Sequence, residues 1–100
     1  MIVVAGYLTI NPDHRAAADA AIATIVPVTE ALEGCVQYRY SEDLTEPNRI
    51  NISEIWESDA AMDEHMAAPE FAAFMTEIGP CIGGDVSVVR YDVASSTKLF

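Results

Sequence analysis

Two hydrophobic periodicities alternate along the chain, and their order restricts the fold more than any other feature. Four segments are rich in β-branched and aromatic residues and predict strands: residues 2–10, 35–42, 49–57 and 85–93. Three segments repeat apolar residues at helical spacing: residues 12–33, residues 58–68 and a further stretch after Pro69. The order is therefore β-α-β-β-α-β, with the second helical region broken at the proline. In 100 residues this order predicts a single-domain, ferredoxin-like α+β sandwich with a four-stranded antiparallel sheet, helices on one face and a tail at residues 94–100.

Capping and helix-breaking residues mark where these elements begin and end. Asn11 and Ser58 are expected to cap the N-termini of the two helical regions. Pro27 lies inside the first helix and is expected to kink it, because proline removes one backbone hydrogen bond. Gly34 is a natural C-terminal stop for that helix. Gly83–Gly84 predict a turn before the last strand.

The first and last strands carry apolar side chains on both sides of their alternation, although two helical regions can cover only one face of the sheet. In the first strand one side has Ile2, Val4, Leu8 and Ile10, and the other has Val3, Ala5 and Tyr7. In the last strand Val86 and Val88 oppose Val89, Tyr91 and Val93. Leaving about six such side chains in water would forgo roughly 1.5–3 kcal/mol each.

A partner is therefore expected on the free face of the sheet, and the simplest partner is a second copy of the chain. The two sheets would pack face to face across a two-fold axis. The middle hairpin is polar on this side, with Gln37, Arg39, Asn51 and Ser53. We therefore expect the dry part of the interface to centre on the first and last strands, with Leu99 and Phe100 reaching across.

Charge and cysteine content exclude several classes of partner. Sixteen acidic residues against five basic ones give a formal charge of −11, whereas nucleic-acid binding needs clustered Lys and Arg. Nucleic acids are therefore not expected partners, and an anionic membrane surface is disfavoured for the same reason. No apolar run approaches membrane-spanning length and no basic leader is present, so we expect a cytoplasmic protein. Cys35 and Cys81 lack CxxC spacing and are expected to be reduced thiols.

A carboxylate and an imidazole come from two apolar faces that are close in sequence. Glu54 and Trp56 share the side of their strand that carries Ile50 and Ile52. In the next helix His65 follows Met62 at i, i+3 spacing. We expect these groups to converge on a pocket between helices and sheet, with other lining from Phe71, Phe74 and Met75 and polar contributions from Tyr7, Tyr38 or Tyr40. An apolar, aromatic cleft with a few polar groups suits a planar organic ligand.

Each of these residues also has a purely structural interpretation. Trp56 is large and apolar and would be buried in any core. His65 could be a core histidine that donates to a backbone carbonyl. Glu54 needs a partner at a buried position, and His65, Arg90 and Arg49 are the candidates. If Glu54 holds His65 in one tautomer, the two form a competent base. Two scattered histidines do not predict a metal site, and no phosphate loop, dinucleotide fingerprint or nucleophile elbow is present.

The pattern E-x-W-x-S-x-x-A-x-x-x-H, which begins at Glu54 and ends at His65, resembles the antibiotic biosynthesis monooxygenase (ABM) domain family. The segment PEFAAF at 69–74 and EGC at 33–35 add to the resemblance, which covers nearly the whole chain. It implies a ferredoxin-like domain that dimerises into an α+β barrel. Some members of the family are similar to cofactor-free oxygenases of phenols and quinols, in which the protein deprotonates the substrate and the resulting anion reduces O₂.

Residue by residue, the resemblance is incomplete. Trp56 matches a pocket tryptophan of those oxygenases, but Ile52 stands where they have a pocket asparagine, and Met75 lies near the place of their pocket arginine. Haem-degrading relatives use an Asn–Trp–His set, whose places here are taken by Tyr7 or a neighbour, His65 and Met75, without the axial histidine. A third branch, similar to an isomerase that processes a phosphorylated autoinducer, shares the spacing of Glu54 and His65.

Together these observations predict a homodimeric, cofactor-independent monooxygenase that acts on a small aromatic or quinol substrate and O₂. His65 is the expected general base and Glu54 its orienter. The expected substrate-binding residues are Trp56, Phe71, Phe74, Met62, Met75, Tyr7 and Ile52. Two alternatives stay open: a proton-transfer isomerase that uses the same pair, and a non-catalytic dimeric ligand-binding module in which the pair only joins helix to sheet.

Overall fold

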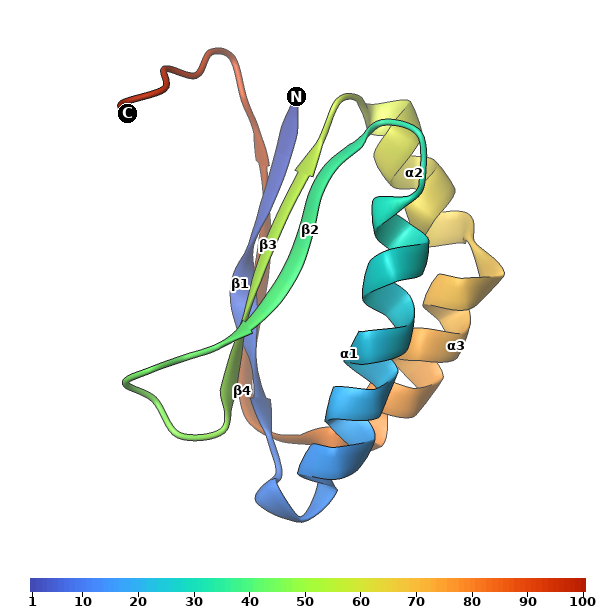
Figure 1. The fold of residues 1–100 in the computed structure, drawn as a ribbon, viewed down its shortest axis with the longest axis vertical. Coiled ribbons are helices and arrows are strands. Elements are labelled where there is room, and N and C mark those ends of the chain that lie inside the picture. Colours follow the sequence, from blue (N-terminus) through green and yellow to red (C-terminus); the bar gives the residue numbers. More distant parts are fainter.

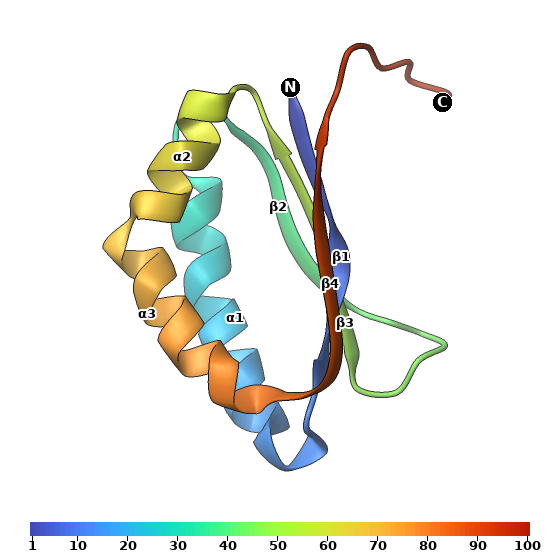
Figure 2. The same ribbon diagram turned by 180° about the vertical axis from the view of Figure 1, so that it is seen from behind.

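Four strands form one antiparallel sheet, and three α-helices cover one of its faces (Figures 1 and 2). The computed structural model describes residues 1–100. In chain order its elements are β1 (Ile2–Ile10), α1 (Arg15–Glu30), β2 (Cys35–Glu42), β3 (Arg49–Trp56), α2 (Asp59–Ala67), α3 (Pro69–Ile78) and β4 (Ile82–Asp92). The strand order in the sheet is β2-β3-β1-β4. The predicted ferredoxin-like α+β fold is confirmed.

The first helical region is shorter than predicted. Pro12–His14 form a 3₁₀ turn, and α1 itself ends at Glu30 rather than at residue 33. Asn11 caps the 3₁₀ turn, because its Oδ1 accepts a hydrogen bond of 3.0 Å from the backbone N–H of Asp13. Pro27 lies inside α1 as predicted.

Gly34 lies in the turn between α1 and β2 and meets two requirements there. Its φ of +85° lies in the left-handed region, which side chains disfavour. An added Cβ would also lie 2.5 Å from the Cβ of Ala61 at the start of α2. A glycine at this position therefore lets the turn approach the helix that carries His65.

The last strand begins three residues earlier than predicted. Gly83 and Gly84 belong to β4 and do not form a turn. A Cβ on Gly83 would lie 2.7 Å from the Cα of Asn11, so this part of the strand passes close to the chain that follows β1. The pairing of β1 with β4 also shifts register between Leu8 and Ile10. Close backbone approach, not a turn, explains the glycine pair.

A second irregularity lies at the start of β2. Strict alternation along β2 would place Val36 on the same side as Tyr38 and Tyr40, but the pairing with β3 shifts register between Cys35 and Gln37. Cys35 therefore lies opposite Trp56, and Val36 is the extra residue and is exposed. From Tyr38 onward the alternation holds.

The core lies between the helices and the inner face of the sheet. The even-numbered residues of β1 and β3 point inward, and the buried ones are Ile2, Val4, Leu8, Ile10, Ile50, Ile52, Glu54 and Trp56. The helices add Ala18, Ala21, Ile25, Ala61, Phe74 and Ile78 to the core, and Tyr38 of β2 and Cys81 before β4 are buried with them. Separately from the core, none of the three α-helices combines the length and the apolar character that a membrane-spanning helix requires.

The outer face of the sheet carries the other side of the alternation. Val3 pairs with Tyr91 and Ala5 with Val89. Tyr91 is 53% exposed and Val89 is 42% exposed. The chain after β4 leaves the sheet on the side away from the helices (Figures 1 and 2), and its Leu99 and Phe100 are fully exposed.

Candidate active site

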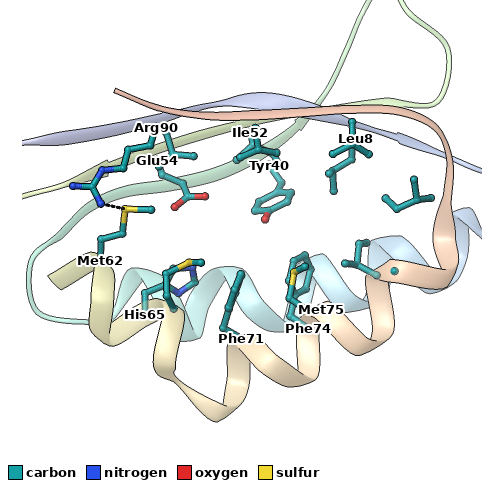
Figure 3. A pocket seen from close by; sticks show the side chains of 17 residues that line it. Leu8, Tyr40, Ile52, Glu54, Met62, His65, Phe71, Phe74, Met75 and Arg90 are labelled. Carbon is teal, nitrogen blue, oxygen red and sulfur yellow. Dashed lines mark hydrogen bonds between the residues drawn. The ribbon is translucent and has the colours of Figure 1, made fainter. Parts of the chain in front are cut away.

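A cavity of about 360 Å³ lies between the inner face of the sheet and helices α2 and α3 (Figure 3). The sheet contributes Val4, Leu8, Tyr40, Ile52, Glu54, Ile82, Val86, Val88 and Arg90. The helical side contributes Met62, His65, Met66, Phe71, Phe74, Met75, Ile78 and Gly79. Apolar side chains dominate this lining, and the only ionisable groups besides Tyr40 are Glu54, His65 and Arg90.

Glu54 points from the middle of β3 into the cavity (Figure 3). It is 7% exposed and pairs across the sheet with Val4 on one side and Tyr38 on the other. Its Oε1 accepts a hydrogen bond of 2.9 Å from the indole Nε1 of Trp56. Burial raises the pKa of the Glu54 carboxyl, and the bond from Trp56 opposes part of that rise.

His65 comes from the last turn of α2 and is 2% exposed. Ser58 begins this helix, since its Oγ accepts a 3.2 Å hydrogen bond from the N–H of Ala61, as the sequence predicted. The imidazole stacks on Trp56, with centroids 5.0 Å apart and an interplanar angle of 21°. Phe71, at 4.5 Å between centroids, contacts it from α3. The position of His65 is therefore set by aromatic packing.

Burial lowers the pKa of His65 to about 4. The imidazole is therefore neutral at pH 7 and keeps a nitrogen lone pair that can accept a proton. Glu54 and His65 point toward one another from opposite walls of the cavity (Figure 3), but no hydrogen bond or ion pair joins them. The expected orientation of His65 by a direct bond to Glu54 is thus not present. Trp56 links the two instead, because it donates to the carboxylate and stacks on the imidazole.

Two of the predicted substrate contacts lie elsewhere. Trp56 is completely buried and lies behind His65, outside the cavity lining. Tyr7 lies on the outer face of the sheet, because it pairs with Asn51 and Ser87 and alternates with Leu8, which faces inward. The guanidinium carbon of Arg49 lies 3.9 Å from the centre of the Tyr7 ring.

The other predicted contacts, which are Ile52, Met62, Phe71, Phe74 and Met75, all line the cavity. The sequence reasoning missed the part of the wall that β4 supplies. Val4 of β1 pairs with Glu54 on one side and with Arg90 on the other, so the three residues form one row across the sheet. The alternation of Val86, Val88 and Arg90 was the available signal, and it needed the pairing of β4 with β1 to become informative.

Arg90 lies at the end of the cavity next to Met62 (Figure 3). Its guanidinium forms an ion pair with Asp92 of the same strand, at 2.9 Å, and another with Asp59 in the first turn of α2. These contacts connect the edge strand to the helix that carries His65. Its positive charge is therefore matched by two carboxylates outside the cavity.

Tyr40 supplies the remaining polar atom. Its hydroxyl lies 3.2 Å from that of Tyr38, and burial raises the pKa of Tyr40 to about 12. The phenol therefore stays protonated at pH 7 and can donate or accept a hydrogen bond. No three His, Cys, Asp or Glu side chains gather in a way that could hold a metal ion. What the arrangement can do is hold a flat apolar molecule and exchange protons with it.

A family model described as antibiotic biosynthesis monooxygenase matches residues 1–77. The chain belongs to this family. The uncharacterized protein sll1783 of Synechocystis is 30% identical over 98% of this chain and 67% of its own length. A Bacillus subtilis protein named "Putative monooxygenase YcnE" is 28% identical over 94% of this chain and 99% of its own length.

Solved structures agree with this assignment. A Deinococcus radiodurans protein named "putative antibiotic biosynthesis monooxygenase" superposes on this ABM domain with a TM-score of 0.90 at 25% identity, over 100% of this chain and 99% of that one. Rv0793 of Mycobacterium tuberculosis shares the fold, with a TM-score of 0.87 at 23% identity over 97% and 98% of the two chains. The predicted family membership is confirmed.

Proposed function

We propose that this ABM domain is a cofactor-independent monooxygenase that acts on a small phenol or quinol in the cavity beneath α2 and α3. The observation that carries the proposal is that a neutral imidazole faces a carboxyl group across a mostly apolar, aromatic space. A planar substrate would pack between the sheet and the rings of Phe71 and Phe74. Family membership supports the reaction class.

In this reaction His65 takes the proton from a substrate hydroxyl as general base. The resulting imidazolium is unfavourable in an apolar site, and the negative charges of Glu54 and of the substrate anion would stabilise it. The electron-rich anion then reduces O₂ and forms a peroxide at ring carbon. The imidazolium returns its proton to the peroxide. The ring carbon then loses its hydrogen as a proton while the O–O bond breaks and hydroxide leaves, so that a phenol and O₂ yield a quinone and water. The protein supplies the base and a space from which water is excluded.

The test follows oxygen uptake and the fate of ¹⁸O₂ with a simple naphthol. Wild type should place one labelled oxygen atom in the product and one in water. His65→Ala should lower the rate by roughly 10²–10⁴-fold, the usual contribution of a general base. His14→Ala is the matched control, because His14 is the other histidine of the chain and is exposed. Equal rates for wild type and His65→Ala would refute the proposal, and solvent deuterium exchange without oxygen uptake would indicate the isomerase instead.

We further propose that a second copy of the chain covers the outer face of the sheet and closes an α+β barrel. Val89 and Tyr91 of β4 lie beside the apolar side chains of β1 on this face, and half of each is in water. A second copy would remove this patch from solvent. Sedimentation at micromolar concentration should show a dimer, and Val89→Glu should yield a folded monomer. A wild-type monomer would refute this proposal.

Cys35 and Cys81 are both free thiols. Free thiols are typical of a reducing compartment, and we therefore propose a cytoplasmic location. Cell fractionation that finds the protein outside the cytoplasm would contradict it.

A further inference from the structure

We propose that the cavity selects its aromatic ligand by charge. It binds molecules that present a neutral or positively charged hydrogen-bond donor to Glu54, and it excludes molecules that carry a negative charge. The inference rests on the proposed function only for placing the ligand in this cavity, and it concerns recognition rather than turnover. The property follows from which charges face the cavity and which are already matched elsewhere.

Glu54 is the acceptor that a ligand would meet. Its Oε1 is held by the indole of Trp56, which fixes the carboxyl group on the floor of the cavity. Neither oxygen bonds to a cationic side chain. A buried carboxylate is unfavourable unless hydrogen bonds or a positive charge compensate it. A ligand hydroxyl or amine would supply that compensation at the remaining lone pairs.

Arg90 does not supply the positive charge that would compensate Glu54. Glu54 and Arg90 lie in one row with a β1 residue between them, so their Cα atoms are about 10 Å apart at the usual strand spacing. The guanidinium forms ion pairs with Asp59 and Asp92, and these two negative charges exceed its single positive charge. The cavity therefore has no unmatched positive charge with which to receive an anionic ligand.

The other walls favour the same choice. His65 is neutral when buried and brings no positive charge. The rings of Tyr40, Phe71 and Phe74 line the space and add no positive charge. The whole chain carries a formal charge of −11, which further repels anions at low ionic strength.

Three probes that share one ring and differ in charge test the proposal: 4-hydroxybenzylamine, 4-hydroxybenzyl alcohol and 4-hydroxybenzoate. Binding is followed without oxygen by the fluorescence of Trp56, the only tryptophan in the chain, which stacks on a residue of the cavity wall. The amine and the alcohol should bind at least about tenfold more tightly than the benzoate, which corresponds to about 1.4 kcal/mol.

Two variants assign the selectivity to Glu54. Glu54→Gln keeps the shape and removes the charge, so the preference over 4-hydroxybenzoate should fall to about threefold or less. Glu64→Gln is the matched control, because Glu64 lies on the exposed side of α2 next to His65 in sequence. It removes the same charge from the chain and should leave the preference unchanged. Isothermal calorimetry checks that a change in fluorescence reports binding.

Tighter binding of the benzoate, equal binding of all three probes, or no binding of any probe to wild type would overturn the inference. So would loss of selectivity in Glu64→Gln as large as that in Glu54→Gln. These outcomes are separable from failure of the monooxygenase proposal. Charge-selective binding without oxygen uptake would refute the oxygenase alone, whereas oxygen uptake without charge selectivity would refute this inference alone.

Discussion

Mild acid should destabilise this fold through His65. The side chain is 2% exposed and has an aromatic neighbour on three sides, so the folded protein resists its protonation. The pKa of His65 is about 4 in the folded chain, against 6.5 for a histidine in water. Between these two values the unfolded chain binds a proton that the folded chain does not, and stability therefore falls as the pH falls.

The size of this effect follows from the two pKa values. Each pKa unit corresponds to about 1.4 kcal/mol, so the full loss between pH 6.5 and pH 4 is about 3 kcal/mol. At about pH 4.5 most of this loss, about 2–3 kcal/mol, should already be present. Above pH 6.5 the imidazole is neutral in both states and contributes no pH dependence. For a domain of this size such a loss is a large fraction of the total stability.

Glu54 acts in the opposite direction. Burial raises the pKa of its carboxyl above the usual 4.5, so the folded chain takes up this proton at a higher pH than the unfolded chain does. Its protonation therefore adds stability as the pH falls through the folded pKa. Asp43, whose pKa is lowered to about 2, contributes a loss only below its usual pKa of 3.8. Measurements above about pH 4.5 thus avoid the contribution of Asp43.

The assay is urea unfolding at a series of pH values from about 7.5 to 4.5. His65→Phe keeps an aromatic ring against Trp56 and removes the titrating group, so its free energy of unfolding should fall by about 2–3 kcal/mol less than that of wild type over this range. Glu54→Gln should show the reverse, a steeper decline than wild type. His14→Ala, at an exposed site, should follow wild type. Parallel curves for wild type and His65→Phe would refute the burial argument.

Two further predictions concern the residues that hold the site in place. Trp56→Phe keeps the ring stack on His65 but removes the hydrogen bond to Glu54, so the free energy of unfolding in urea should fall by about 1–3 kcal/mol. The pH dependence assigned to Glu54 should move to higher pH, and an unchanged pH dependence would contradict this prediction. Gly34→Ala should destabilise by more than about 1 kcal/mol, because of its positive φ and the close Cβ of Ala61. Gly79→Ala, where an added Cβ meets nothing within 4 Å, should lack that penalty, and equal losses in the two variants would contradict the reasoning.

Where the strands pair regularly, alternation was sufficient to predict which residues share a face. It placed Glu54 and Trp56 together on the inner face, and both are there. It also placed Tyr7 and Leu8 on opposite faces of the sheet, which conflicted with the prediction that Tyr7 lines the pocket. Tyr7 lies on the outer face, as the alternation indicates. The face on which a side chain lies does not, however, determine whether it reaches the cavity. Nothing in the spacing distinguishes a side chain that ends in the cavity, such as Glu54, from one that ends behind it, such as Trp56.

Irregular pairing accounts for the errors within the strands. Val36 is one extra residue in β2 and changes which side chains there face inward. Gly83 and Gly84 lie in a wider shift, where three residues of β4 oppose Thr9 of β1 alone. Period-two patterns cannot locate such a shift, because the sequence on either side of it alternates normally. Arg90 was predicted as a candidate partner of Glu54, but it pairs with Asp59 and Asp92, and its place in the cavity wall was missed for a related reason. Its neighbours across the sheet depend on the register of β4 against β1, which is a property of two distant segments.

The position of the cavity follows from how three helices share four strands. Helix α1 packs against β2 and α2 against β3, and no helix lies over the edge strand β4 to a similar extent. Val86 and Val88 consequently remain 49% and 47% exposed although they belong to the inner face. A ligand in the cavity would cover both and complete the core along this edge. Because such a ligand binds only the folded chain, its affinity adds to stability. The buried carboxyl of Glu54 has no cationic partner and therefore lowers the stability of the empty domain. The same group can accept a hydrogen bond from a ligand, which favours binding.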